Sequence, residues 1–342
     1  MNHFHVPGVS AAYFDSGELR WNRCFGVLEN GSTDTVTENT IFHACSISKM
    51  ITALCIIRLA QDKRLSLYTD VNKYLTAWKI PEGELLKHKK VTPANLLSHQ
   101  AGFYDLEGSF EPHHRGDPAP KPIDLLRGTT RYNSEEVRVK YEPETDFAYS
   151  DAGYCIVAQL VEALLGETVP QIAKRFIFDP LGLKHTFFWE IGEGLGYSDK
   201  INPSCCASGH DSNGITVEDR RAHYPNIEGA ALWTTPTELS VITLDLLASY
   251  NNGGGVVLDQ EMARIMLTPH GNSPFSCLGL FYDSREDFYF TQGWGVGMQC
   301  KMRFYPKTQR GVAVMTNSEP GIEQDKALVG EIIDFVCKHG EL

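Results

Sequence analysis

The part of the sequence that most constrains the fold lies between residues 44 and 60, where a short polar stretch leads into an apolar helix. Residues 51–60, ITALCIIRLA, place apolar side chains on nearly every face of a helix. This pattern is typical of a helix buried inside a protein. Ser46 stands where the helix begins, and Lys49 follows three positions later. One helical turn should therefore bring the Lys49 ammonium beside the Ser46 hydroxyl.

This serine and lysine pair has two interpretations. A serine hydroxyl is a weak nucleophile at neutral pH and needs a neighbouring base or a cation that favours the alkoxide. The positive end of the helix dipole acts in the same direction. In the structural alternative, Ser46 caps the helix and Lys49 is solvated. The pair alone favours the structural alternative, so the rest of the sequence has to decide.

Length and charge argue against several classes of partner. The 342 residues allow one large domain or two closely packed lobes, and no apolar stretch approaches the length of a bilayer. The formal charge of −12 argues against nucleic acid. His3 and His5 share one face of a strand pattern, but two histidines near a terminus are more often incidental than metal ligands, and the pair at 113–114 lacks convincing metal spacing. We expect a small-molecule substrate, no cofactor, no metal, no nucleic acid and no membrane, and we leave the oligomeric state open.

Cysteine usage favours a reducing compartment. The nine cysteines have no framework spacing, and the adjacent pair Cys205 and Cys206 is poorly suited to a mutual disulfide. Cys45, Cys55 and Cys155 fall in apolar runs, where a free cysteine behaves as a small hydrophobe. Residues 1–5, MNHFH, contain no charged region followed by an apolar core, so we expect no signal peptide. We therefore expect a cytoplasmic protein, although a chain whose leader had been removed would look the same.

The order of the expected elements indicates an α+β fold. Strand patterns occur at residues 9–14, 19–27, 278–282, 288–291, 297–305 and 311–317, whereas helical patterns dominate the middle and include 152–165, 169–177 and 235–250. We predict an antiparallel sheet built from both termini and flanked by helices, with an inserted all-helical lobe. The whole chain, 1–342, would be one catalytic domain. Its α/β lobe would span about 1–61 and 232–342, and its helical lobe about 62–231.

Several motifs, taken in order, resemble one known family. Ser46 to Lys49 matches S-x-x-K, and Tyr149-Ser150-Asp151, about a hundred positions further on, resembles Y-x-N. Supporting segments occur in the expected order: VPGV at 6–9, LLSHQAG at 96–102, GAALWTTP at 229–236 and GVAVMTN at 311–317. The chain thus resembles the serine β-lactamase and penicillin-binding-protein superfamily, in its class C and esterase branch. The resemblance implies a sheet lobe facing a helical lobe, with the serine in the cleft between them.

The residue types suggest a mechanism. Ser46 would attack an ester or amide carbonyl and form an acyl-enzyme. Tyr149 is the candidate base; a phenol titrates near pH 10, so it needs a nearby cation, and Lys49 is the obvious one. Backbone N–H groups of Ser46 and of the strand carrying the third motif would hold the oxyanion. The alternative for Tyr149 is a buried tyrosine whose hydroxyl caps a loop.

Two positions depart from the family pattern. Asp151 stands where many members carry asparagine; an ionised aspartate accepts hydrogen bonds only, so it could pair with Lys49 but not donate to a substrate. Lactam-handling members of this family carry Lys-Thr-Gly as their third motif, and the lysine supplies a cation; the corresponding segment here, at residues 291–297, is TQGWGVG. Either Thr291 or Gln292 replaces the family's cation, and we expect substrate or oxyanion support from Asp151, Gln292, Gly293, Trp294 and Gly295. Trp294 is either a wall of the acyl pocket or plain core. Without the cation, an uncharged ester or amide is the more plausible substrate.

Other polar residues are expected to have ordinary roles. His99 should make a structural hydrogen bond, and Glu107, Glu111 and Asp117 should belong to a solvated loop. Loops within 103–148 and 191–228 should line the pocket. We favour a serine hydrolase of the esterase type. The alternatives are a β-lactamase or D-amino-acid amidase or peptidase, an acyltransferase, and a sensor or binding module that is acylated and stalls.

Overall fold

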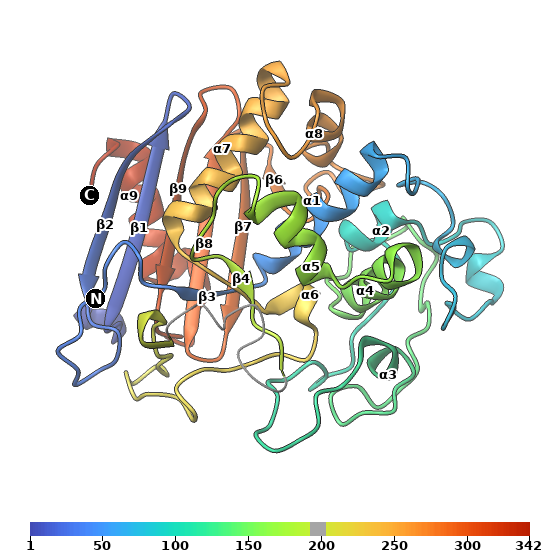
Figure 1. Ribbon diagram of the computed structural model, residues 1–342, viewed down its shortest axis with the longest axis horizontal. Coiled ribbons are helices and arrows are strands. Elements are labelled where there is room, and N and C mark those ends of the chain that lie inside the picture. Colours follow the sequence, from blue (N-terminus) through green and yellow to red (C-terminus); the bar gives the residue numbers. More distant parts are fainter. Residues whose placement is uncertain (192–202) are drawn as a thin grey trace.

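Two antiparallel sheets with helices packed around them appear in this computed structural model, which describes residues 1–191 and 203–342 (Figure 1). The larger sheet has the strand order β2-β1-β9-β8-β7-β6, and the smaller one has the order β3-β5-β4. The strands are β1 (Gly8–Asp15), β2 (Glu18–Gly26), β3 (Phe42–Cys45), β4 (Phe187–Phe188), β5 (Leu232–Thr234), β6 (Phe281–Asp283), β7 (Phe288–Gly295), β8 (Met298–Tyr305) and β9 (Arg310–Thr316).

Helices cover the large sheet on both faces and fill the middle of the chain. The α-helices are α1 (Ser48–Gln61), α2 (Pro93–Leu97), α3 (Pro122–Leu126), α4 (Ala152–Leu165), α5 (Val169–Ala173), α6 (Ile227–Ala230), α7 (Pro236–Asn252), α8 (Gln260–Met266) and α9 (Leu328–His339). A π-helical turn, η4 (Lys174–Phe178), continues α5, and a 3-10 turn, η7 (Gln324–Lys326), precedes α9. In Figure 1 the helices of the middle of the chain gather to one side of the large sheet.

The large sheet joins the two ends of the chain, as predicted. β1 pairs antiparallel with both β2 and β9, so the N-terminal hairpin lies beside the last strand. Side chains alternate along β9: Val312 and Val314 belong to the cluster around α9, whereas Ala313 and Met315 belong to the main core. This period-2 pattern lets one strand bury both faces. The predicted fold class is therefore confirmed.

Helix α1 is buried on all sides, as its sequence predicts. Ile51, Leu54, Ile56 and Ile57 are at most 1% exposed and belong to the main hydrophobic core. Burying one such side chain stabilises the fold by about 1.5–3 kcal/mol. In Figure 1, α1 lies between the large sheet and the helices of the middle of the chain. Packing on every side holds the start of α1 in a fixed position.

The structure also differs from the predicted elements. β4, at Phe187–Phe188, lies inside the region expected to be all-helical, and it pairs with β5 in a small sheet that the sequence did not predict. These strands have two to four residues, too few for an alternating pattern to show. β6 begins at Phe281 rather than at 278, and β7 continues to Gly295 rather than stopping at 291. The limits of the two lobes stay a prediction.

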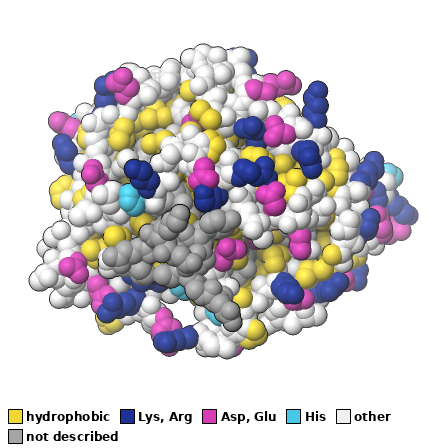
Figure 2. Space-filling model, in the orientation of Figure 1, with side chains coloured by type: hydrophobic (Ala, Val, Ile, Leu, Met, Phe, Trp, Pro, Cys, Tyr) yellow, Lys and Arg dark blue, Asp and Glu magenta, His cyan; other side chains and the backbone are white. Residues whose placement is uncertain are grey.

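The surface charges, the cysteines and the lengths of the apolar helices also bear on the expectations from the sequence. Figure 2 shows acidic and basic side chains interspersed over the face in view. All nine cysteines are free thiols, and Cys45, Cys55 and Cys155 are buried as expected. Among the described residues no single helix is long and apolar enough to span a bilayer. Within the same described residues, Ala152–Leu165 and Val169–Phe178, a pair bent by 73°, together reach that length and composition.

Candidate active site

Ser46 lies in the tight turn that joins β3 to α1. Cys45, just before it, has a left-handed backbone with φ of 48°, a conformation that is uncommon for a residue other than glycine. The Ser48 hydroxyl donates to the Cys45 carbonyl at 2.5 Å and accepts from the Leu232 N–H at 2.9 Å. These two bonds tie the turn to β5. The turn leaves Ser46 only partly buried at the start of α1.

Lys49 reaches back to Ser46, as the i+3 spacing predicts. Its Nζ donates to Ser46 Oγ at 3.3 Å, to Asp151 Oδ1 at 2.6 Å and to the Gly229 carbonyl at 2.9 Å. Burial alone would lower the pKa of Lys49, but the Asp151 carboxylate and the Tyr149 phenol outweigh burial and raise that pKa above its usual value. Lys49 is therefore a cation at neutral pH.

Tyr149 completes the group of three. The Lys49 Nζ lies 4.8 Å from the centre of the Tyr149 ring, within the range of a cation–π contact. Although the residue as a whole is 41% exposed, burial of its hydroxyl end, with the Asp151 charge, raises the pKa of the phenol above its usual value; the Lys49 charge and hydrogen bonding to Lys49 and Ser46 act in the opposite direction. Two polar groups from one helical turn and a third from about a hundred residues further on thus meet at the start of α1.

His99 supports Tyr149 and does not act as a base. Its ring stacks on the Tyr149 ring at 4.3 Å, and its Nδ1 accepts a hydrogen bond from the Ser150 N–H at 3.2 Å. Burial, with help from the Lys49 charge, holds the pKa of His99 well below its usual value. The imidazole is therefore neutral, and the predicted structural hydrogen bond is confirmed.

Asp105 leaves the Asp151 side chain free to face Lys49. The first N–H groups of a helix need acceptors. Here Asp105 accepts from the N–H groups of Asp151, at 2.5 Å, and Ala152, at 3.3 Å, and from the Ser150 hydroxyl at 2.8 Å. Burial, followed by the charge of Asp151, raises the pKa of Asp105 to about 6. Because Asp105 caps α4, Asp151 can bind Lys49 instead.

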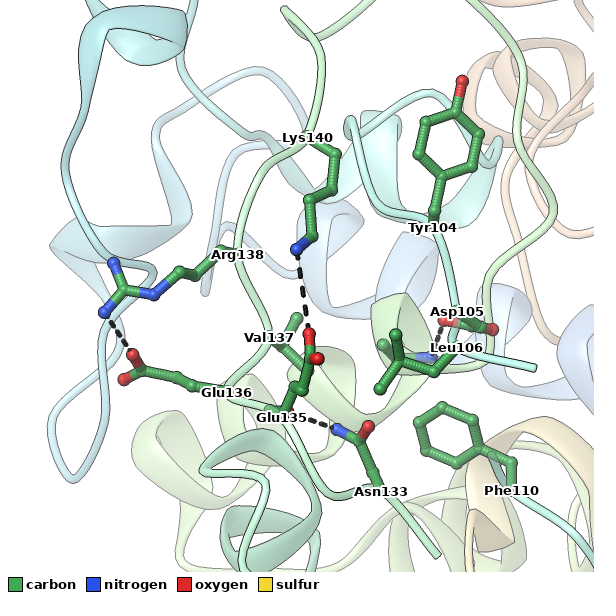
Figure 3. A pocket seen from close by; sticks show the side chains of 11 residues that line it. Tyr104, Asp105, Leu106, Phe110, Asn133, Glu135, Glu136, Val137, Arg138 and Lys140 are labelled. Atoms are coloured by element: carbon green, nitrogen blue, oxygen red, sulfur yellow. Dashed lines mark hydrogen bonds and ion pairs between the residues drawn. The ribbon is translucent and has the colours of Figure 1, made fainter. Parts of the chain in front are cut away.

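A small cavity lies behind Asp105 (Figure 3). Ion pairs between Lys140 and Glu135, at 4.0 Å, and between Arg138 and Glu136, at 2.5 Å, lie on its wall. Its volume is about 20 Å³, which is enough for a water molecule but not for a substrate. We assign it no role in the chemistry.

The edge of β7 passes directly beside the Ser46 turn. A Cβ atom on Gly293 would lie 2.3 Å from the Ala44 carbonyl oxygen, and one on Gly295 would lie 2.9 Å from Cys45 Sγ. Only glycine permits such a close approach. In the described residues, β6 pairs with β7 no further than Phe290. The backbone N–H groups beyond Phe290 are therefore candidates for the second oxyanion donor, beside that of Ser46.

The strand alternation separates the two candidates for the missing cation. Thr291 is 3% exposed and shares the inward face of β7 with Gly293. Gln292 points the other way and lines a cavity that also contains Ser46. Its Oε1 atom is buried, with no hydrogen-bond partner among the described residues. Neither residue brings a charge to the site.

The cavity beside Ser46 has a volume of about 480 Å³. Its lining comprises Ser46, Phe147, Tyr149, Phe275, Phe281, Phe290, Gln292, Trp294 and Gln324. Trp294 is 41% exposed, so it is a wall of the cavity and not core. The predicted loops contribute less than expected: among the described residues, Phe147 alone comes from 103–148, and no lining residue comes from 191–228. Residues 192–202 lie outside the described residues.

Comparison with known proteins identifies the family. The sequence model of the family described as Beta-lactamase matches residues 1–334. The chain belongs to the beta-lactamase family. The resemblance carried by the serine, tyrosine and glycine motifs is therefore confirmed.

Individual beta-lactamase relatives are distant. One from Salmonella gallinarum, named "Putative D-alanyl-D-alanine carboxypeptidase", is 27% identical over 284 residues, or 78% of this chain and 61% of the relative. The chain thus spans less than two thirds of that relative's length. The octameric penicillin-binding protein homologue from Pyrococcus abyssi has a TM-score of 0.76 at 20% identity, covering 100% of this chain and 75% of the other. The D-amino acid amidase from Ochrobactrum anthropi SV3 complexed with L-phenylalanine has a TM-score of 0.77 at 18% identity, covering 97% of this chain and 93% of the other. At these identities, the two structures show a common fold.

Several site residues of this beta-lactamase family member were not predicted from its sequence. Asn226 donates to Asp151 Oδ1 at 2.8 Å, and the Gly229 carbonyl binds Lys49. Gln324, from η7, lines the cavity. Gly229 begins the segment at 229–236 that resembles the family, and that resemblance is the one feature of the sequence that could have pointed to it. Asp105 and Gln324 belong to no motif.

The buried acid Glu228, beside the site, gives a test of how burial changes the pKa of a carboxyl group there. Glu228, next to Gly229, is 4% exposed, and burial raises the pKa of its carboxyl to about 8. The folded state therefore binds a proton that the unfolded state releases near pH 4.5, so stability falls as pH rises between these values, by about 1.4 kcal/mol per unit. We expect Glu228→Gln to be progressively more stable than the wild type from pH 5 to pH 8, measured by urea unfolding. Parallel stability curves for the two proteins would contradict this assignment.

Proposed function

We propose that this chain is a serine hydrolase that cleaves an uncharged ester through an acyl-enzyme on Ser46. The observation that carries the proposal is the meeting of Ser46, Lys49 and Tyr149, with Lys49 Nζ 3.3 Å from Ser46 Oγ. A catalytically inactive member of the family would have no physical need to bring these three side chains together. Amide hydrolysis is the second candidate, favoured by the carboxypeptidase and amidase names of the two relatives.

The proposed mechanism uses Tyr149 as the base and Lys49 as a fixed cation. Tyr149 accepts the Ser46 proton in its phenolate form, which burial disfavours and the Lys49 cation favours, as Ser46 Oγ bonds to the substrate carbonyl carbon. The Lys49 cation stabilises the phenolate, and backbone N–H groups of Ser46 and β7 stabilise the oxyanion. The phenol then protonates the leaving alcohol. In the second half, water attacks the acyl carbon as Tyr149 takes a proton from it, and the phenol returns that proton to Ser46 Oγ as the bond between Ser46 Oγ and the acyl carbon breaks.

The lining of the cavity supports an uncharged substrate. Where lactam-handling relatives present a cation, this chain places Thr291 inward and Gln292 in the cavity wall. None of the described lining residues carries a formal charge in its ordinary state. Binding a substrate carboxylate there would remove it from water without a charged partner, which is unfavourable.

A nitrophenyl ester and a chromogenic cephalosporin assayed side by side test this proposal. We expect steady turnover of the ester, with kcat/KM at least about a hundredfold above that for the cephalosporin, because a missing charged partner of a buried anion is worth several kcal/mol. Comparable rates for the two substrates would contradict the uncharged-substrate assignment. A stoichiometric burst without turnover would favour the sensor. Product esters formed with an added alcohol would favour an acyltransferase.

A further inference from the structure

The cavity beside Ser46 has an aromatic wall built from two loops and two strands. Phe147 packs against Phe275 with ring centres 4.9 Å apart, and Phe281 packs against Phe290 at 5.4 Å. Phe147 and Phe281 link the two pairs at 6.2 Å. The rings come from the loop before Tyr149, the loop after α8, and strands β6 and β7. Their contacts hold one another in place before any ligand arrives.

This wall is open to a ligand. Phe275, Trp294 and Tyr149 are each 41% exposed, and all three line the cavity. Exposed apolar side chains that gather around a polar centre mark a binding site, because burying them on a ligand is favourable. Aromatic rings gain further from edge-to-face or offset contacts with another ring.

The same cavity wall contains one buried polar atom that has no partner among the described residues. Gln292 Oε1, in the same wall, is buried without a partner among the described residues. An unpaired buried acceptor is unfavourable, and a ligand N–H or O–H would satisfy it. The cavity therefore presents aromatic faces with a neutral hydrogen-bonding group, within reach of the Ser46 hydroxyl.

We propose that this cavity is a subsite for an aromatic ring of the substrate, with Phe275 as a specificity-determining residue. The inference rests on the proposed function, since the ring would be carried by the ester that Ser46 attacks. The substrate class is esters that carry an aromatic ring on either the acyl or the alcohol side, in preference to short aliphatic esters.

Three unactivated esters test the subsite: methyl acetate, methyl phenylacetate and benzyl acetate. Hydrolysis of each ester is measured in a pH-stat from the protons that it releases. The two aromatic esters place the ring on the acyl or on the alcohol side, with leaving groups of similar basicity. We expect at least one of them to exceed methyl acetate by about thirtyfold or more in kcat/KM, because burying a ring contributes a few kcal/mol. Phe275→Ala should reduce that preference about tenfold, measured as the ratio of kcat/KM for the preferred aromatic ester to kcat/KM for methyl acetate.

The control is Phe335→Ala, which removes a comparably exposed phenylalanine, 49% exposed, from α9. It should leave all three rates unchanged. If the aromatic esters show no preference, or if Phe275→Ala leaves the preference intact, the subsite is wrong although ester hydrolysis stands. If no ester is hydrolysed and a fluorophosphonate does not label Ser46, the proposed function itself is wrong, and the subsite with it.

Discussion

Replacing Lys49 with methionine is expected to lower kcat/KM for ester hydrolysis by at least about a thousandfold. The change removes the donor to Ser46 Oγ and the cation 4.8 Å from the Tyr149 ring. Without that cation, burial and the Asp151 charge both hold the phenol in its protonated form. Formation of the phenolate that accepts the Ser46 proton would then be still less favourable than in the wild type over the whole working range of pH. Steady-state kinetics from pH 6 to pH 9 measure the loss.

A matched control separates this chemical effect from a loss of stability. Lys301 in β8 has a side chain that is 3% exposed, like that of Lys49, and it is paired with Asp325. Lys301→Met should destabilise the fold but keep the activity of the folded protein within about threefold, because Lys301 contacts neither Ser46 nor Tyr149 in the described structure. If Lys49→Met retained a tenth of the wild-type activity, Lys49 would not have the role assigned here.

The second large effect concerns Asp151. Asp151→Ala leaves the buried Lys49 ammonium without its counter-ion, which should lower the free energy of unfolding at pH 7 by about 3 kcal/mol. The pKa of Lys49 in the folded state lies above its usual 10.5. The stabilising contribution is therefore fully present at pH 7 and is lost only as pH rises through the folded-state value. Urea unfolding at pH 7 measures the difference.

Asp151→Asn is the matched control, because it keeps the shape of the side chain and an oxygen acceptor. It should cost less stability than alanine. The carboxylate raises the pKa of both Lys49 and Tyr149, so the asparagine variant should also move the pH–rate profile to lower pH. An unchanged unfolding midpoint for Asp151→Ala would show that the ion pair contributes nothing to folding.

The residues that the sequence could predict are those with a local chemical signature. Ser46 and Lys49 are one helical turn apart, so the motif itself brings them together. Tyr149 and Asp151 belong to a second motif at the expected distance, and the structure places both beside Lys49. Helix α4 runs from Ala152 to Leu165, with Gly166 as its left-handed cap, as its pattern indicates.

What the sequence could not predict depends on contacts between distant segments. Asp105 lies in an irregular loop, and its capping of α4 follows from how that loop folds back. The aromatic wall joins Phe147, Phe275 and Phe281, which share no local pattern. β7 reaches Gly295 despite its glycines, which weaken a strand by themselves. The close approach of Gly293 to Ala44 explains why glycine is required there.

The most direct test of the central claim is to locate the covalent adduct formed by a fluorophosphonate, using intact mass and peptide mapping on the wild type and on Ser46→Ala. We expect one adduct per chain, on the peptide containing Ser46, and none on the folded alanine variant. An adduct that persists in Ser46→Ala, or that maps to another residue of the wild type, would contradict Ser46 as the nucleophile.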